Sequence, residues 1–303
     1  MHTGVFSRPG YSILVSLLLG SSLFSPPAIA GATLAKIKDA QTVTLAYRET
    51  TAPFSYLDGD KRPIGFTLDL CSKIVDGIRQ ELKLPQLKVN YLAVTPSTRI
   101  AAISSGKADL ECGTTTNNTE RRKQVAFTVP HFFAGVRMAV RADSGIKNWA
   151  DLRGKKVVTT KGTTTIKLLN DRNKVRALAL NLVEGTDHAE SFSMLEKGQA
   201  DAFVMDDVIL FGFRANMKNP GEFVIVGDAL SVEPYAIMLG KDDAEFKTLV
   251  DREMANMEHD GDFRKIYNKW FMSPVPPLGK SMNMPMGYLL RDSIIFPTDK
   301  VGD

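Results

Sequence analysis

Two short segments of this 303-residue chain carry hydroxyl and guanidinium groups that could bind a small anion. Residues 114–121 follow an expected strand and combine three consecutive threonines with Arg121, whose planar guanidinium can hold a carboxylate through two parallel hydrogen bonds. Residues 162–165 read Gly-Thr-Thr-Thr, follow another expected strand and open a helix, so their backbone N–H groups would face an anion. The pattern predicts a carboxylate site beyond the carboxyl ends of strands.

Motifs for other kinds of chemistry are absent from the sequence. It contains no GxSxG, HExxH or GxGxxG motif, and its four histidines are scattered without ligand spacing. We therefore expect a ligand-binding site with no metal, no cofactor and no catalytic residue.

Composition narrows the class of protein and partner. The formal net charge is +4, from 38 Lys and Arg against 34 Asp and Glu, and no long basic block concentrates it. Nucleic acid is therefore not an expected partner. A hydrophobic content of 44% and a mean hydropathy of −0.10 indicate a globular chain rather than a polytopic membrane protein.

The first thirty residues have the features of a secretory signal. Arg8 precedes an apolar run over residues 13–24, and Ala28 and Ala30 supply small residues before an expected cleavage after Ala30. The alternative is a membrane anchor, for which the run is shorter than the roughly 20 residues of a span. We expect residues 1–30 to be a signal peptide and the mature chain to be periplasmic.

The two cysteines, Cys71 and Cys112, both lie in the exported part of the chain. Oxidising compartments favour pairing, so a single disulfide is expected. Two buried free thiols acting as small hydrophobes are the alternative.

Hydrophobic periodicity indicates an α/β fold. Strands are expected at residues 42–48, 87–94 and 108–112, and helices at 66–82 and 97–105. This alternation favours parallel βαβ units. The second half repeats the scheme, with strands at 156–160, 178–183 and 200–205 and helices after Gly162, over 190–196 and from Asp207.

A short sequence echo supports two related lobes. Gly-Lys-Ala-Asp at residues 106–109 and Gly-Gln-Ala-Asp at 198–201 each stand between an expected helix and an expected strand. In both places we expect the glycine to end the helix in the left-handed conformation.

Two extended apolar runs, residues 136–141 and 235–239, flank the second α/β unit. They are interpreted as paired crossover strands that carry the chain out of the first lobe and back. Lobe 1 would then comprise residues 31–138 and 237–303, and lobe 2 residues 139–236. Helices at 244–258 and 262–271 would return to lobe 1, followed by an irregular tail after Met272.

A series of short motifs runs in order along the chain. They are Tyr47-Arg48-Glu49, Pro53-Phe54-Ser55-Tyr56, residues 65–70, Thr98-Arg99-Ile100, residues 111–118, Glu120-Arg121, residues 150–155, Gly162-Thr163-Thr164, Asp187-His188 and Met205-Asp206-Asp207.

From residue 31 to about 277, the chain resembles the periplasmic solute-binding proteins of polar amino-acid ABC importers, and most closely their glutamate/aspartate-binding branch. The resemblance implies a type II periplasmic-binding-protein fold, with two open mixed or parallel sheets joined by two hinge strands. It also implies one ligand in the cleft and lobes that close over it.

The resemblance implies a role for each matching polar residue around an amino-acid backbone. Arg121 would bind the α-carboxylate, and Asp206 would pair with the α-ammonium. Thr114, Thr116 and Thr164 would supply hydroxyl or amide hydrogen bonds.

Three further positions would surround an acidic ligand side chain by the same resemblance. Arg48 and Arg99 would supply cations, and His188 would donate a hydrogen bond. The chain departs from the branch at Pro96, where the family often has serine, so either Thr95 or Ser97 substitutes or one ligand hydrogen bond is missing. Glutamate, aspartate and another dicarboxylate therefore remain alternatives.

Two classes of function fit the sequence. The first is a monomeric binding protein that delivers an acidic amino acid to an inner-membrane ABC permease, with a role as ligand sensor for a membrane receptor as its variant. The second is an enzyme on the same scaffold that resembles cyclohexadienyl or arogenate dehydratases, for which Glu111 is the acid nearest the expected pocket that has no assigned partner.

Overall fold

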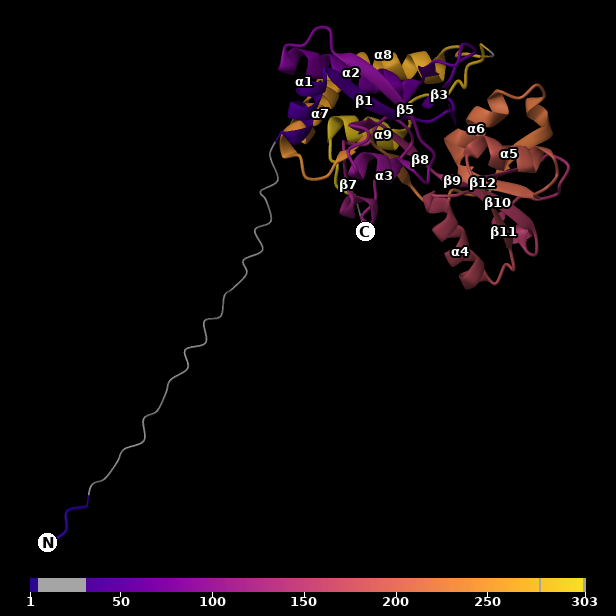
Figure 1. Ribbon diagram of the computed structural model, residues 1–303. Coiled ribbons are helices and arrows are strands. Elements are labelled where there is room, and N and C mark those ends of the chain that lie inside the picture. The colour runs from indigo at the N-terminus through magenta and orange to yellow at the C-terminus, as the bar shows by residue number, and fades with distance from the viewer. Residues whose placement is uncertain (5–30, 278, 302–303) are drawn as a thin grey trace.

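The computed structural model describes residues 1–4, 31–277 and 279–301 (Figure 1). The expected signal peptide at residues 1–30 lies almost wholly outside these residues. Within the described ranges, no helix combines the length and the apolar character that a membrane span needs. Figure 1 shows two bodies side by side, one built from both ends of the chain and one from its middle.

The first body is built on a mixed five-stranded sheet. Its strands lie in the order β5 (Lys88–Ala93), β1 (Thr42–Tyr47), β6 (Leu110–Glu111), β15 (Met238–Gly240) and β7 (Val125–Phe127). Strand β1 is parallel to β5 and β6, whereas β15 is antiparallel to β6 and β7. The C-terminal part of the chain therefore completes the first sheet.

Helix α2 (Phe66–Leu82) matches the predicted range, because its apolar residues recur at helical spacing and are buried. A disulfide joins Cys71 of α2 to Cys112, which follows β6. The expected disulfide is confirmed. The other helices of this body are α1 (Ala32–Ala40), α3 (Arg99–Ser104), η1 (Arg121–Lys123), α7 (Ala244–His259), α8 (Asp262–Tyr267) and η4 (Asn268–Met272), beside a small sheet of β2 (Thr50–Thr51), β3 (Ser55–Leu57) and β4 (Pro63–Ile64).

The second body contains a mixed five-stranded sheet of its own. The order is β11 (Asn181–Gly185), β10 (Lys156–Thr160), β12 (Ala202–Asp206), β9 (Val136–Arg141) and β13 (Phe223–Val226). Strands β11, β10 and β12 are parallel, and β9 is antiparallel to β12 and β13. Its helices are η2 (Trp149–Leu152), α4 (Thr164–Arg176), α5 (His188–Glu196), α6 (Asp207–Ala215) and η3 (Pro220–Glu222).

The two glycines of the sequence echo adopt the expected conformation. Gly106 and Gly198 have φ of 71° and 66°, in the left-handed region that favours glycine. Each follows a helix and precedes a strand of its sheet, so the two bodies repeat this connection.

The expected pairing of residues 136–141 with 235–239 is wrong. The strands that pair between the bodies are β8 (Phe132–Ala134) and β14 (Glu233–Tyr235), which are antiparallel. Strand β9 instead lies within the second sheet and β15 within the first. An apolar run identifies a buried strand but not its partner, which explains the error. The lobe boundaries at residues 138/139 and 236/237 stay a prediction.

The tail after Met272 is not wholly irregular, because it contains helix α9 (Tyr288–Ile295). The tail is held by backbone and side-chain contacts, including Tyr267 Oη to the Met284 carbonyl at 3.2 Å and Asn117 Nδ2 to the Asp299 carbonyl at 2.9 Å. The C-terminal segment therefore packs on the first body.

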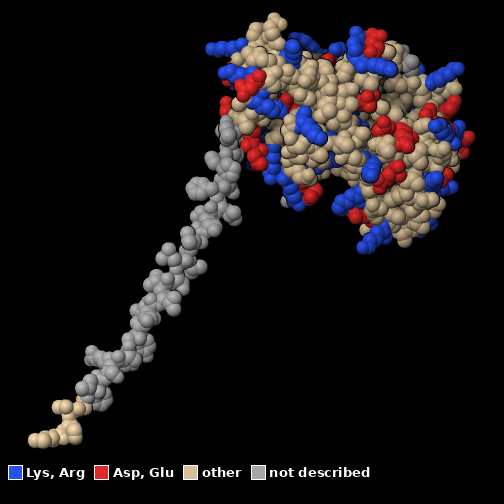
Figure 2. Space-filling view, viewed as in Figure 1, with Lys and Arg blue, Asp and Glu red and all other residues tan. Residues whose placement is uncertain are grey.

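Charged side chains are spread over the surface. On the face that Figure 2 shows, Lys and Arg lie interspersed with Asp and Glu over both bodies, without a continuous basic band. This face offers no electrostatic track for a nucleic-acid backbone.

We expect the disulfide to contribute strongly to stability. The Cys71→Ser/Cys112→Ser double variant should lose about 3–4 kcal/mol of unfolding free energy, because a loop between residues 41 apart is no longer closed in the unfolded chain. Urea unfolding monitored by circular dichroism measures the loss. Wild-type protein with reductant should match the variant, and equal midpoints for oxidised wild type and variant would contradict this role.

Candidate functional site

The predicted site residues stand where strands end and helices begin. Arg48 directly follows β1, and Asp206 is the last residue of β12. Arg99, Thr164 and His188 are the first residues of α3, α4 and α5. In open α/β sheets this edge is where ligands bind, so the topology gathers residues from both bodies at one place.

Three guanidinium groups are buried together in the first body. Arg48, Arg99 and Arg121 are only 1%, 3% and 7% exposed. Arg99 Nη1 donates to the Thr114 carbonyl at 3.2 Å, and Arg121 Nη1 donates to the Thr116 carbonyl at 2.9 Å. Neither terminal nitrogen of Arg48 has a hydrogen-bond partner among the described residues. Buried donors of this kind are suited to an anionic ligand.

Burial lowers the pKa of all three arginines, and mutual repulsion adds to the effect at Arg48 and Arg121. Burial, followed by repulsion from Arg99, lowers the pKa of both Arg48 and Arg121 to about 9. Burial also lowers the pKa of Arg99, opposed by the nearby Glu111. A carboxylate placed among the three groups would restore the stability of their charged forms.

His188 lies against the same cluster and is 2% exposed. Its Nδ1 is 2.9 Å from the Thr160 hydroxyl oxygen. Burial, with Arg48 and Arg99 nearby, lowers the pKa of His188 well below its usual value. The imidazole is therefore neutral at neutral pH and acts through hydrogen bonding rather than charge.

Asp206, a buried acid of the second body, interacts electrostatically with Arg99 and Arg121. The Tyr235 hydroxyl donates a short hydrogen bond to Asp206 Oδ2, while Asp206 Oδ1 has no hydrogen-bond partner among the described residues. Burial, followed by repulsion from Glu233, raises the pKa of Asp206 to about 8. A cationic group at Oδ1 would stabilise the carboxylate form.

The predicted threonines contribute in different ways. Thr114 and Thr116 are buried, and their carbonyls hold two of the arginines. The Thr164 hydroxyl donates to Glu233 Oε2 at 3.0 Å, a contact that sequence reasoning did not anticipate. Thr116 also forms a β-bridge with Tyr235, which joins the loop of Thr114, Thr115 and Thr116 (the threonine loop) to β14.

The two bodies touch directly at the site. Arg121 Nη2 donates to the Gly162 carbonyl at 3.5 Å. A Cβ built on Gly162 would lie 2.7 Å from backbone atoms of Pro96 and Ser97, and Gly162 has φ of 79°. Only glycine therefore allows this approach. Pro96, the departure from the family pattern, forms part of the contact.

The expected substitutes for the missing serine are placed differently. The Thr95 hydroxyl is 3.2 Å from that of Thr98, and the Ser97 side chain is exposed. Neither has a hydrogen bond to the arginine cluster among the described contacts.

Sequence reasoning missed two residues of the site, Glu233 and Tyr235. Both belong to β14, which pairs with β8 and follows an irregular connection from β13. Their role depends on contacts across the two bodies, for which the local pattern carries no signal. In the described part of the chain, no group of three or more His, Cys, Asp or Glu is arranged to hold a metal ion.

We expect Asp206 to make stability depend on pH in protein without added ligand. Because its folded pKa of about 8 lies above the value of 3.8 for an aspartate in the unfolded chain, its contribution is complete below pH 4 and is lost as pH rises through 8. In Asp206→Asn this loss should vanish, changing the slope by up to about 1.4 kcal/mol per pH unit. Urea unfolding from pH 5 to pH 8 measures both slopes, and parallel curves would exclude the titration.

Comparison with known proteins agrees with this architecture. The family model for bacterial extracellular solute-binding proteins, family 3, matches residues 43–273. The chain is 44% identical to an L-glutamate/L-aspartate-binding protein of Pseudomonas aeruginosa, over 96% of this chain and 97% of the relative. It is 39% identical to a glutamate/aspartate import solute-binding protein of Escherichia coli, over 97% and 98%.

A solved structure has the same fold. It is an ancestral amino acid-binding protein described as a precursor of cyclohexadienyl dehydratase, with 28% identity and a TM-score of 0.68 over 79% of this chain and 99% of that one. With two open sheets, a site at their facing strand ends and these matches, the chain belongs to the bacterial extracellular solute-binding proteins of family 3.

Proposed function

We propose that this protein is the periplasmic solute-binding component of an ABC importer and binds an acidic amino acid between two lobes. The lobes are taken as residues 31–138 with 237–303, and residues 139–236. The observation that carries the proposal is the cluster of three buried guanidinium groups opposite a buried aspartate. An amino dicarboxylate carries two anions and one cation, which complement this arrangement.

The α-groups of the ligand are assigned to the residues nearest the contact between the bodies. Arg121 would bind the α-carboxylate. Its Nη2 already donates to the Gly162 carbonyl of the opposite body, so its guanidinium lies where the two bodies meet. The unpaired Oδ1 of Asp206 would accept from the α-ammonium. Thr114, Thr116 and Thr164 would add hydrogen bonds around these groups.

The side-chain carboxylate is assigned to Arg48, Arg99 and His188. The unpaired terminal nitrogens of Arg48 and the unpaired Nε of Arg99 are donors without protein acceptors among the described residues. Neutral His188 can donate one further hydrogen bond. Two arginines buried at this end favour an anionic side chain over its amide.

The proposed role is binding without catalysis. Two curated relatives are named for glutamate/aspartate binding or import. The acids around the site each accept from a neighbouring hydroxyl: Glu111 from Thr115, Asp206 from Tyr235 and Glu233 from Thr164. The structural neighbour that relates to the enzyme alternative is described as a precursor of cyclohexadienyl dehydratase, and this precursor is itself named an amino acid-binding protein.

In the proposed import cycle, the ligand stabilises the closed arrangement of the lobes and a membrane permease recognises it. The protein would act as a monomer in the periplasm. An ABC permease is proposed as the membrane partner because a relative is named as an import solute-binding protein.

Isothermal titration with the twenty amino acids and common dicarboxylates tests the proposal. L-glutamate or L-aspartate should bind most tightly, with their amides much weaker. Tight binding of a neutral or basic amino acid in preference to both would overturn it, and turnover of prephenate or arogenate would favour the enzyme.

We expect two arginines to separate affinity from selectivity. Arg99→Ala should weaken acidic ligands most and reduce their preference over amides, because it removes a cation from the side-chain end. Arg121→Ala is the matched control and should weaken all amino acids by about 3–5 kcal/mol. Calorimetry measures both, and a uniform loss in Arg99→Ala would remove its role in selectivity.

We expect Gly162→Ala to hold the lobes apart. The added Cβ would meet the backbone of Pro96 and Ser97 at 2.7 Å. L-glutamate affinity should fall at least about tenfold, and small-angle X-ray scattering should show a larger radius of gyration with ligand. Gly145→Ala is the control, with φ of 74° but nothing within 4 Å of its Cβ. Equal affinity in the two variants would contradict the contact's role.

A further inference from the structure

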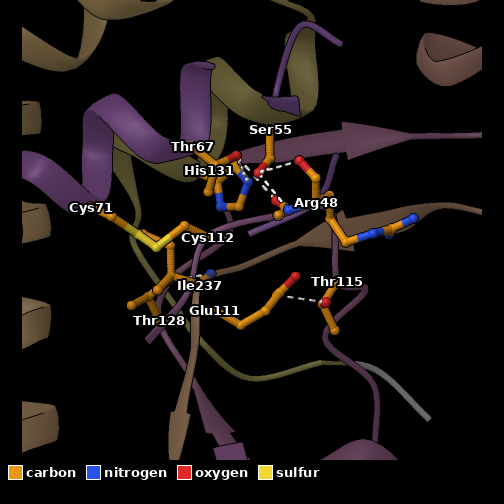
Figure 3. Close-up of a disulfide and its surroundings, with 11 residues drawn as sticks. Arg48, Ser55, Thr67, Cys71, Glu111, Cys112, Thr115, Thr128, His131 and Ile237 are labelled. Atoms are coloured by element: carbon orange, nitrogen blue, oxygen red, sulfur yellow. Dashed lines mark hydrogen bonds between the residues drawn. A yellow bond between two sulfur atoms is a disulfide. The ribbon is translucent and has the colours of Figure 1, made fainter. Parts of the chain in front are cut away.

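One buried acid, Glu111, is not used by the proposed ligand contacts. It is the last residue of β6, lies opposite Ala46 of β1, and is fully buried. The Thr115 hydroxyl donates to its Oε2 at 2.7 Å, whereas Oε1 has no hydrogen-bond partner among the described residues. Figure 3 shows Glu111 beside Thr115 and near Arg48, close to the disulfide.

The side chains of Glu111 and Arg48 meet over one glycine. A Cβ built on Gly113 would lie 2.3 Å from Glu111 Oε1 and 3.1 Å from Arg48 Cγ. Both side chains therefore occupy the space that a larger residue at 113 would fill. This brings the unpaired carboxylate oxygen close to the Arg48 side chain at the ligand-facing edge of the sheet.

Glu111 acts electrostatically on all three site arginines. Its charge opposes the lowering of the pKa of Arg48, Arg99 and Arg121 that their burial causes. It forms no salt bridge with them within 4.0 Å among the described pairs, and its bonded partner is neutral. Its negative charge is thus available to the cluster as a whole.

We propose that Glu111 is a specificity-determining counter-anion that sets the net charge of the side-chain end of the site to +1. The inference rests on the proposed function. Among the fully buried groups there, Arg48 and Arg99 contribute two positive charges, Glu111 removes one, and His188 is neutral. Asp187, which also acts on Arg48, is partly exposed and caps helix α5, so it is not counted among them. A single carboxylate neutralises the remainder, whereas a dianionic side chain would leave an excess negative charge. The acid thereby matches the pocket to glutamate or aspartate.

The first test compares the thermal midpoints of Glu111→Gln and wild type, with and without saturating L-glutamate. Without ligand, Glu111→Gln should melt about 5–10 °C lower, because the arginines lose their counter-anion. With L-glutamate the rise should exceed that of wild type, since the ligand carboxylate replaces the missing charge. Thr115→Val is the matched control, because it removes the hydrogen bond but keeps the charge, and its ligand-induced rise should equal that of wild type.

If Glu111→Gln lowers the midpoint by the same amount with and without L-glutamate, relative to wild type, the role of Glu111 is purely structural and the inference is overturned. An unchanged ligand-free midpoint would overturn it as well. Absence of any rise in wild type, combined with a low ligand-free midpoint in Glu111→Gln, would instead count against the proposed ligand.

The second test uses charge selectivity. Calorimetry at pH 8 compares L-glutamate with O-phospho-L-serine, whose side chain is dianionic at that pH. Glu111→Gln should shift the affinity ratio at least about tenfold toward the phosphorylated ligand, and Thr115→Val should not. An unchanged ratio, or failure of the phosphorylated ligand to bind either form, would contradict the charge-setting role.

Discussion

The site depends on guanidinium groups that the fold buries without enough protein anions to pair them. Arg48 and Arg99 are almost wholly inaccessible, and neither forms a direct ion pair among the described contacts. Such groups are held in place by packing and by carbonyls such as that of Thr114. These contacts offset only part of the free-energy cost of removing the charges from water. Ligand binding can therefore draw on stability that the ligand-free protein lacks, which couples folding energy to recognition.

Strand topology explains how distant residues converge. The parallel strands β1 and β6 end at the same edge, so Arg48 and Glu111 become neighbours although 63 positions separate them in the sequence. The disulfide between Cys71 and Cys112 anchors the chain immediately after Glu111 to helix α2. The threonine loop that follows is hydrogen-bonded to β14, so the polar groups are held on rigid elements.

Much of the fold was predictable because it depends on local patterns. The amphipathic pattern of residues 66–82 predicted both ends of helix α2 correctly, and the glycines at 106 and 198 predicted where two further helices end. Partners of strands were not predictable, as the β8–β14 pairing shows, and neither was helix α9. Within the site, Arg121 was indicated by its surroundings, but Arg48, Arg99, His188 and Asp206 were identified only through the family resemblance.

In the proposed function, the charged groups that recognise the ligand are divided between the two bodies, which would make closure selective. Arg48 follows a strand of the first body and Arg99 and Arg121 begin helices of it, whereas Asp206 ends a strand of the second sheet. A ligand with carboxylates alone would pair with the arginines of the first body and leave Asp206 Oδ1 without a partner, whereas an amine alone would do the reverse. With these proposed roles, only a molecule carrying both signs of charge would gain contacts in each body, and it would stabilise the arrangement in which Gly162 meets Pro96.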